Sequence, residues 1–505
     1  MEIDWQVGPA SEWRADALIF FGLEEATEPL PGFKRWLDQH GQWLSASPAL
    51  RDFQGKYQEV AVCYGPPEAN IPRVVMAGLG TREKFDMERL QGSAAAALNR
   101  CRELRLARPA FCLRSFYGLP LMVDSALKEA LIGGLTGLHR YEELKTRDIT
   151  PSAAPSNLVV LNEYEPTPEL RALPGAAAAV AAGIILARDL VSSPANRATP
   201  AFLADCARRL ADRDGCRIEV IGLEKAESMG MGGFAAVARG SRQPACMIVL
   251  ERFPEADRRE SPIVFVGKGI TFDTGGISLK PRDHLEEMKQ DMAGAAAVLG
   301  AFETLGRLGS DRHVVGIMPC TENMPGGNAY KPGDVIRTMS GLTVEVISTD
   351  AEGRMVLCDA LTYAMRYKPA AVFDIATLTA AVIIALGQRV AAVMANRDIL
   401  AEAVVDIGAQ AGERLWPLPL YDLYFDYLKS DVADFKNVGD RTAGSIVGGM
   451  FLKQFVPDTT PWAHLDIAGT AWTDKDLGTT PRGGTGFGVR TLTELALQWP
   501  DLGIR

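Results

Sequence analysis

Short runs of β-branched and other apolar residues alternate with helical stretches along most of this 505-residue chain. Seven such runs after residue 216 are read as strands: RIEVIG, ACMIVLERF, PIVFVGKG, HVVGIMPCT, LTVEVIST, AAVFDIAT and RVAAVMAN. Strands that alternate with helices are typical of a sheet with helices on both faces. The pattern therefore predicts an α/β/α sandwich with a mixed, largely parallel sheet in the C-terminal part of the chain.

The same alternation occurs on a smaller scale in residues 1–165, which predict a smaller N-terminal α/β domain for assembly or regulation. A chain of this length is too long for one hydrophobic core, so two domains are expected. The proline-rich loop at 150–157 and residues 166–192 predict a linker, with a connecting helix that begins near residue 176. The apolar run GAAAAVAAGIILA in this helix is too short and too alanine-rich to span a bilayer, which indicates a buried helix. Residues 193–505 are the predicted catalytic domain.

The charge balance limits the partners that we expect. Hydrophobic residues make up 47% and charged residues 23% of the chain, as in a soluble globular protein. The net charge of −10 argues against general binding to the phosphate backbone of nucleic acids. The segment Met1–Phe21 carries acids early and lacks the basic stretch and apolar core of a secretory signal. We therefore expect a cytoplasmic protein that does not bind membranes and whose main role is not nucleic-acid binding.

The segment STDAEGRMVL, residues 348–357, carries the most informative charged side chains. Asp350 and Glu352 stand two residues apart at the end of an expected strand, where side chains at positions i and i+2 face the same side. Arg354 follows them, where a helix is expected to begin. Two convergent acids at the carboxyl end of a strand, with a cation beside them, are suited to binding metal ions.

Two earlier segments add further acids and lysines. The glycine-rich stretch at 266–281 contains Lys268, Asp273 and Lys280, and Asp291 precedes a run of alanine and glycine. Each acid alone could cap a turn or a helix, or lie on a helix surface. Together with Asp350 and Glu352 they make four carboxylates among glycines and apolar residues, and burying these without cations is very unfavourable. Two divalent metal ions would offset that charge, so the sequence predicts a metal cluster.

Motifs of several other hydrolase classes are absent from the sequence. The five histidines form no H-E-x-x-H pair, which argues against a zinc protease with histidine ligands. The chain contains no G-x-S-x-G nucleophile motif and no P-loop. A serine hydrolase and a P-loop nucleotide hydrolase are therefore disfavoured.

The three charged segments, in this order and spacing, resemble the leucine aminopeptidase (cytosol aminopeptidase) family. The signature of that family is NTDAEGR, which reads STDAEGR here. The resemblance covers residues 185–495 and extends to RDLVSSPANRATP, SDVADFKNVGDRTAGSIVGGMFL, WAHLDIAGTAW and GGTGFGVR. It implies a leucyl aminopeptidase, a metal-dependent exopeptidase that hydrolyses leucine and other mainly apolar residues from peptide N-termini with a metal-activated water.

The family's metal ligands match five positions of this chain. The resemblance implies that Asp273 and Glu352 bridge two divalent metal ions, most often zinc or manganese. Lys268 and Asp291 would bind one ion, and Asp350 would bind the other. A lysine can bind a metal only as a neutral amine, so the pKa of Lys268 is expected to be strongly lowered, as burial beside cations would do.

The resemblance also assigns catalytic and binding roles. Lys280 would stay charged and polarise the scissile carbonyl. Arg354 would hold a bicarbonate ion that acts as general base, and Leu378 would lie at the same anion site. Met288 and Thr377 would line the pocket for the first side chain of the peptide.

Three positions depart from the family pattern: Ser348 replaces asparagine, Met355 replaces leucine and Ala380 replaces glycine. We expect these changes to tune the site without abolishing it. The family assembles as a hexamer of two stacked trimers, so a homohexamer is expected here. The alternatives are another di-metal hydrolase such as a phosphoesterase, a DNA-binding regulatory relative, or a catalytically silent relative. Because the matching site residues are all present, the silent relative is disfavoured.

Overall fold

The computed structural model describes residues 1–25, 28–40, 42–147, 155–253 and 261–504. The chain forms two compact units, one made of Met1–Ala181 with Lys475–Arg482 and the other of Ala182–Asp474 with Gly483–Arg505. The division falls inside a helix, α6 (Pro168–Ser192), within the expected linker region. Most of the proline-rich loop expected at 150–157 lies outside the described residues.

Helix α6 is longer than the sequence pattern predicted. It begins eight residues earlier than expected, where the hydroxyl of Thr167 accepts a hydrogen bond from the N–H of Leu170 at 3.3 Å. Proline is tolerated in the first turn, and α6 also contains Pro174 further along. Among the described residues, α6 is the one helix long and apolar enough to cross a membrane, a property it shares with core helices of soluble proteins.

The first unit contains a six-stranded sheet with a single antiparallel pair. In spatial order the strands are β1 (Glu2–Val7), β6 (Asn157–Asn162), β5 (Pro109–Cys112), β2 (Ala17–Gly22), β4 (Arg73–Gly78) and β3 (Val60–Tyr64). All neighbours are parallel except β3 and β4. The C-terminal segment Lys475–Arg482 belongs to this unit, where Gln58 donates a hydrogen bond to the carbonyl of Leu477 at 3.2 Å and Arg140 pairs with Asp476 at 3.3 Å.

The second unit contains a nine-stranded mixed sheet. In spatial order its strands are β16 (Leu415–Pro417), β15 (Ala391–Ala395), β18 (Trp462–Asp466), β14 (Ala371–Ala376), β9 (Ile263–Gly267), β11 (Val314–Asn323), β8 (Cys246–Arg252) and β7 (Arg217–Gly222), and β10 (Gly269–Asp273) also pairs with β11. The central strands β18, β14, β9 and β11 run parallel to one another. The predicted mixed, largely parallel sheet is therefore confirmed.

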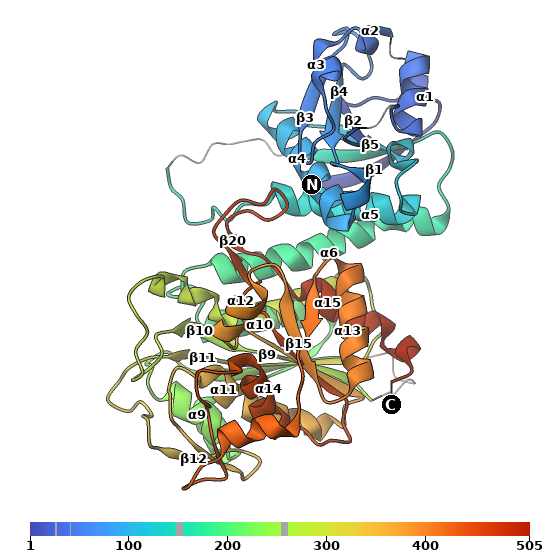
Figure 1. The fold of residues 1–505 in the computed structure, drawn as a ribbon. Coiled ribbons are helices and arrows are strands. Elements are labelled where there is room, and N and C mark those ends of the chain that lie inside the picture. Colours follow the sequence, from blue (N-terminus) through green and yellow to red (C-terminus); the bar gives the residue numbers. More distant parts are fainter. Residues whose placement is uncertain (26–27, 41, 148–154, 254–260, 505) are drawn as a thin grey trace. The chain divides into compact units, whose positions relative to one another are not determined.

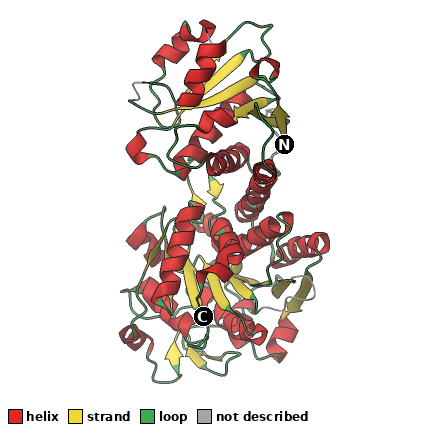
Figure 2. Cartoon of the chain, turned by 90° about the vertical axis from the view of Figure 1, so that its right-hand side faces the viewer, coloured by secondary structure: helices red, strands yellow, loops and turns green. Residues whose placement is uncertain are grey.

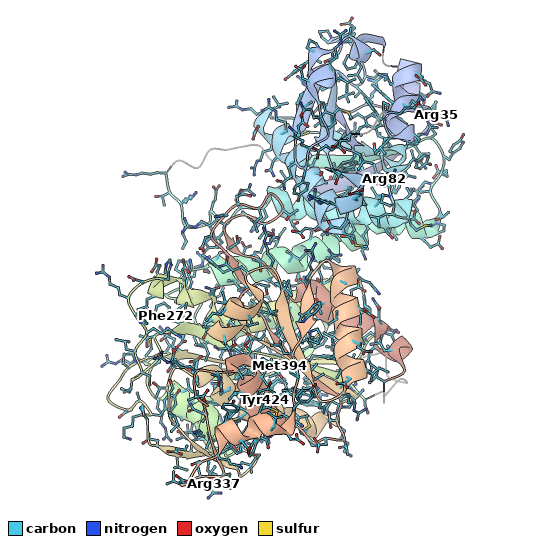
Figure 3. All side chains as sticks on the ribbon, viewed as in Figure 1. Arg35, Arg82, Phe272, Arg337, Met394 and Tyr424 are labelled. Atoms are coloured by element: carbon cyan, nitrogen blue, oxygen red, sulfur yellow. The ribbon has the colours of Figure 1, made fainter. Side chains whose placement is uncertain are left out.

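Helices cover both faces of this sheet (Figures 1 and 2). One layer contains α7 (Pro200–Asp214), α10 (Ala293–Arg307), α13 (Asp398–Ala411) and α15 (Val489–Gln498), and the other contains α9 (Gly232–Ala238), α11 (Glu352–Ala364) and α14 (Gly444–Lys453). Between the layers the side chains pack tightly: a Cβ atom on Gly449 of α14 would lie 2.8 Å from the sulfur of Met394 on β15 (Figure 3). The second unit is thus the predicted α/β/α sandwich.

Packing of α11 against the sheet fixes the first turn of this helix. Leu357 and Leu361 of α11 are fully buried in one apolar cluster with Val264 and Val266 of β9. Burying a leucine or valine side chain contributes about 1.5–3 kcal/mol. Because α11 begins at Glu352, this packing holds the charged residues of the first turn in place.

One predicted strand is much shorter than expected. Of the run LTVEVIST, only Thr343–Glu345 (β13) is a strand, and it lies in a small sheet between β12 (Val335–Arg337) and β17 (Phe435–Lys436). Thr349 and Asp350 form a turn, and Glu352 is already helical. The premise that Asp350 and Glu352 lie on extended backbone is therefore wrong.

Candidate metal centre

The carboxyl ends of three strands in the large sheet meet at the candidate site. Lys268 follows the last residue of β9, Asp273 ends β10, and Thr377 follows the last residue of β14. Parallel strands bring their carboxyl ends to the same edge of a sheet, where open α/β folds bind ligands. Asp291 approaches from a 3-10 turn, Leu285–Met292, that precedes α10.

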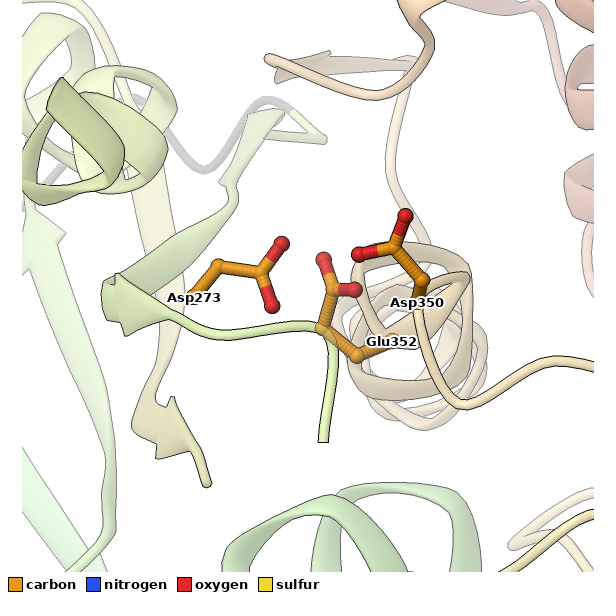
Figure 4. Close-up of side chains that lie close together, drawn as sticks. All are labelled: Asp273, Asp350 and Glu352. Atoms are coloured by element: carbon orange, nitrogen blue, oxygen red, sulfur yellow. The ribbon is translucent and has the colours of Figure 1, made fainter. Parts of the chain in front are cut away.

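Three carboxylates converge beside these strand ends (Figure 4). One oxygen from each of Asp273, Asp350 and Glu352 lies within 4.8 Å of the others. Asp273 and Glu352 are buried, whereas Asp350 is exposed at the edge of the group. The predicted convergence of Asp350 and Glu352 is present. It arises from a turn followed by the start of a helix, and not from the extended backbone that the prediction assumed.

Lys268 is buried beside two of the predicted acids. Its Nζ atom lies 2.7 Å from Oδ1 of Asp291 and 2.8 Å from Oε1 of Glu352, and it donates a hydrogen bond to the carbonyl of Thr377 at 2.9 Å. The hydroxyl of Thr377 donates to the same Asp291 oxygen at 2.8 Å. These contacts place the Lys268 nitrogen against two carboxylates and a backbone carbonyl.

Lys280 lies on the other side of the acid group. Its Nζ atom is 2.9 Å from Oδ2 of Asp273 and also contacts Oδ1 of Asp350. Its side chain is 23% exposed, so a ligand that enters from solvent can reach the ammonium. The structure therefore brings all four predicted acids and both predicted lysines into one site.

Burial and mutual repulsion shift the pKa values of these acids. Burial, reinforced by the charge of Glu352, raises the pKa of Asp273 to about 6 and raises that of Asp291 well above its usual range. Burial also opposes ionisation of Glu352, but Lys268 and Lys280 outweigh it and lower the pKa of this carboxyl. Four carboxylates against two lysines leave an excess of negative charge that favours cations.

The pKa of Lys268 differs in direction from the expectation. Burial lowers it, but the charges of Asp291, Glu352 and Asp273 outweigh burial and raise it above the usual value. The protein side chains alone therefore keep this amine protonated. A neutral amine ligand at this position requires metal cations that compete with the proton.

Two features of the described residues fit a divalent metal. Oδ2 of Asp291 and Oδ1 of Asn323 are buried and have no hydrogen-bond partner in the described part of the chain. Carboxylate oxygens with one amine nitrogen form a donor set suited to divalent ions of borderline character, such as manganese or zinc. The residues present therefore fit the predicted metal site.

Asn323 is a site residue that the sequence reasoning missed. At the end of β11, its Nδ2 donates hydrogen bonds to Oδ1 of Asp273 at 2.7 Å and to the carbonyl of Thr349 at 2.9 Å, and it lies 3.4 Å from Oε2 of Glu352. One amide thus holds two of the acids. The only available signal was its position two residues after a predicted strand, which is weak.

Arg354 is buried near the acids, with part of its guanidinium unused. Its Nη1 donates to the carbonyl of Asn437 at 2.7 Å, whereas its Nε has no partner in the described part of the chain. Burial lowers the pKa of Arg354 to about 10. Arg354 and the side chain of Leu378 both face Gly448, where a Cβ atom would lie 3.4 Å from Nη2 and 3.1 Å from Cδ2 respectively. The N–H of Leu378, however, already donates to Asp466 at 3.2 Å.

The remaining predicted positions are less closely tied to the acids. Met288 lies partly exposed in the 3-10 turn that carries Asp291. The hydroxyl of Ser348, at the departure from the family signature, accepts the N–H of Asp350 at 3.2 Å. Met355 is fully buried in the core, and Ala380 is the first residue of helix α12 (Ala380–Leu386).

Comparisons with known proteins agree with this geometry. Residues 185–493 match the catalytic domain of the cytosol aminopeptidase family, and residues 21–148 match the N-terminal domain of the same family. A probable cytosol aminopeptidase of Syntrophobacter fumaroxidans is 99% identical over the full length of both chains. Another, from Nitratidesulfovibrio vulgaris, is 48% identical over 98% of each chain.

Two solved structures are similar over nearly the whole chain. A mutant of tomato leucine aminopeptidase has a TM-score of 0.87 and 32% identity, over 99% of this chain and 96% of that one. The bottromycin maturation enzyme BotP in complex with Mn has a TM-score of 0.83 and 34% identity, over 95% of this chain and 98% of that one. The alternatives of a phosphoesterase and a DNA-binding regulator are not favoured. The resemblance is confirmed: this chain belongs to the cytosol aminopeptidase family and is a metal-dependent aminopeptidase, a hydrolase that removes residues from the N-termini of peptides.

Proposed function

We propose that the converging side chains hold two divalent metal ions. Asp273 and Glu352 would serve both ions, Lys268 and Asp291 would serve one of them, and Asp350 would serve the other. The observation that carries this proposal is the approach of three carboxylates to within 4.8 Å, with the Lys268 amine 2.8 Å from one of them. Manganese and zinc are the proposed metals, and the manganese complex of BotP supports the first.

The protein side chains contribute positioning and charge to hydrolysis. A bound pair of metal ions lowers the pKa of a water molecule and polarises the scissile carbonyl. Lys280 donates a hydrogen bond to the developing charge on that carbonyl oxygen, a role that its partial exposure allows. The carboxylates raise the pKa of Lys280 above its usual value despite burial, so the ammonium stays protonated at neutral pH.

We assign anion binding to Arg354. A buried guanidinium with an unpartnered Nε in the described part of the chain offers a fixed charged donor to a small planar anion such as bicarbonate. A bicarbonate ion held there would supply a general base for the attacking water. Leu378 is proposed to line the same space through its side chain, since its N–H is engaged by Asp466.

Specificity for the first residue of the peptide is assigned to the pocket of Met288 and Thr377. Thr377 faces the acids, because its hydroxyl and its carbonyl bond Asp291 and Lys268 respectively. Met288 supplies the apolar wall and favours leucine and methionine. Pockets of this kind discriminate by only about 1–3 kcal/mol per methylene, so broad specificity is expected.

We further propose a cytoplasmic homohexamer. Large apolar side chains that are exposed in the single chain support burial against other copies, as at Ile384 (89% exposed), Trp416 (61%) and Leu423 (61%). Sedimentation at micromolar concentration tests the assembly. A stable monomer contradicts it.

The metal assignment is tested by hydrolysis of leucine p-nitroanilide with manganese-loaded protein. The wild type is expected to be active, and Glu352→Ala is expected to lose several orders of magnitude in kcat/KM. Equal activity of the two proteins would show that the site is assigned wrongly. Inactivity of both proteins with manganese bound would point to a different substrate.

A further inference from the structure

A short turn after strand β14 contacts the metal centre on one side and a buried carboxylate of the neighbouring strand on the other. This turn consists of residues 377–379, and β14 lies beside β18, with Ala376 opposite Asp466 in the register of the two strands. Asp466 is fully buried and was not among the residues singled out from the sequence. Its carboxylate is directed at the turn.

Both oxygens of Asp466 are engaged. Oδ1 accepts hydrogen bonds from the N–H groups of Leu378 at 3.2 Å and Ala468 at 3.3 Å. Oδ2 accepts from the hydroxyl of Thr379 at 2.6 Å, and this hydroxyl also lies 2.8 Å from that of Ser445 on α14. Asp466 therefore ties the turn both to its own strand and to a helix.

The same turn holds two of the proposed metal ligands. At the first position of the turn, the carbonyl of Thr377 accepts from Lys268 and its hydroxyl donates to Asp291. A displacement of the turn therefore moves both groups together. No hydrogen bond or ion pair between Asp466 and Asp350 or Asp273 occurs among the described residues, and the turn is linked to the second metal position only indirectly, through Lys268 and Glu352. A displacement of the turn therefore acts first on the position served by Lys268 and Asp291.

We propose that Asp466 is a positioning residue that fixes the turn at 377–379 and thereby sets the geometry of the metal position served by Lys268 and Asp291. The proposal rests on the proposed function. Metal sites tolerate displacements of only about 0.5 Å, and loss of a residue that orients a ligand typically reduces metal affinity about 10- to 100-fold. A buried carboxylate suits this place because three donors converge there.

Two substitutions of Asp466 distinguish its role in positioning the turn from the effect of its negative charge. In Asp466→Asn the side-chain oxygen can still accept from the two N–H groups. Its NH2 group can donate to the Thr379 hydroxyl, which can then donate to Ser445. Asp466→Ala leaves the N–H groups of Leu378 and Ala468 without this acceptor and leaves the Thr379 hydroxyl with Ser445 alone. A positioning role therefore predicts that asparagine retains metal binding and alanine does not.

Asp374 offers a matched control. It is a fully buried carboxylate on β14 that accepts hydrogen bonds from Trp462 at 2.7 Å and from His464 at 2.5 Å. Within the described part of the chain, no hydrogen bond joins its side chain to the turn at 377–379. Asp374→Asn thus perturbs the same strand pair and a similar polar network without releasing the turn.

The test is titration calorimetry of Mn2+ into the full-length, metal-depleted protein and its variants. Asp466→Ala is expected to weaken one of two manganese sites, the one served by Lys268 and Asp291, at least tenfold and to weaken the other less. Asp466→Asn is expected to stay within about threefold of the wild type, and Asp374→Asn is expected to match the wild type. Unchanged binding in Asp466→Ala overturns the proposal, as does equal weakening in Asp374→Asn.

Two further variants keep the outcome decisive. Asp291→Asn is the reference for the metal assignment: if it also leaves both manganese sites intact, the proposed function fails and this inference fails with it. If Asp291→Asn loses one site and Asp466→Ala does not, only the positioning role is refuted. Should Asp466→Ala fail to fold, Thr379→Val decides, because it removes the hydroxyl donor to Oδ2 of Asp466 while Oδ1 keeps its two N–H donors, and it is expected to weaken the same site.

Discussion

Replacing Gly353 by alanine tests whether the position of Lys268 is essential. A Cβ atom at residue 353 would lie 2.6 Å from Cε and 2.8 Å from Nζ of Lys268. Because carbon atoms pack at about 3.5 Å or more, the end of the lysine must move by about 0.9 Å, the difference between 3.5 Å and the Cε distance. It cannot swing into solvent, since the side chain is buried and held by Asp291, Glu352 and Thr377.

The expected effects on activity and on stability differ in size. A displacement of about 1 Å at a reacting site costs about 100-fold in rate, so kcat/KM should fall by about that factor. Overpacking costs about 1–3 kcal/mol, and the helix gains roughly 0.5–1 kcal/mol when glycine becomes alanine. The net loss of stability, about 2.5 kcal/mol at most, should leave the protein folded.

The assay combines hydrolysis of leucine p-nitroanilide, manganese titration and thermal unfolding. Gly175→Ala is the matched control, because residue 175 lies in helix α6 and a Cβ atom there meets nothing within 4 Å. This control should gain stability slightly and keep full activity. Wild-type kcat/KM and manganese affinity in Gly353→Ala would refute the reasoning.

Three further predictions concern stability and metal binding. Glu413→Ala should destabilise the protein by about 2–4 kcal/mol in urea unfolding, because the buried carboxylate accepts two N–H groups and a hydroxyl at the start of helix α15. Burial raises the pKa of Asp359 from 3.8 to about 6, so the native state binds its proton more tightly than the unfolded chain. Its contribution to stability should therefore fall by about 3 kcal/mol as the pH rises from about 4 to about 6, and Asp359→Asn should remove this slope. Chelation should abolish activity, and manganese at 100 times its dissociation constant should stabilise the wild type by about 2.7 kcal/mol but Asp291→Asn by less.

Each of these predictions has an outcome that contradicts it. An unchanged urea midpoint in Glu413→Ala would mean that water replaces the lost acceptor. Parallel pH profiles of wild type and Asp359→Asn would show that another group carries the slope. Equal thermal shifts on adding manganese to wild type and to Asp291→Asn would place the metal elsewhere.

The sequence was sufficient to predict the layers of the catalytic unit and the identity of the acids. Strand β9 reads as a continuous apolar run, and β14 does so except at Asp374, because helices bury both strands on both faces. The acids and lysines of the site could also be recognised, because charged residues among glycines and apolar residues are not typical of a solvent-exposed surface. The convergence of Asp350 and Glu352 was predicted on a wrong premise, because residue periodicity cannot distinguish a strand from a turn that starts a helix.

Contacts between distant segments could not be read from local patterns. Asn323 holds Asp273 from a position 50 residues away, and Asp466 reaches Leu378 across 88 residues. Neither Asn323 nor Asp466 stands at a sequence spacing from the other site residues that would indicate its contact. The direction of the pKa shift of Lys268 could not be predicted either, because it depends on how many carboxylates surround the amine once the chain is folded.

The segment Lys475–Arg482 makes the smaller unit discontinuous along the chain. The polypeptide leaves this unit at residue 181, builds most of the larger one, returns for eight residues and departs again. No single cut therefore separates the units: a fragment that ends at 181 lacks the segment that bonds Gln58 and Arg140, and a fragment that begins at 182 carries that segment without its partners. The smaller unit is therefore expected to be complete only when Lys475–Arg482 is present, and it cannot be exchanged as a simple N-terminal module.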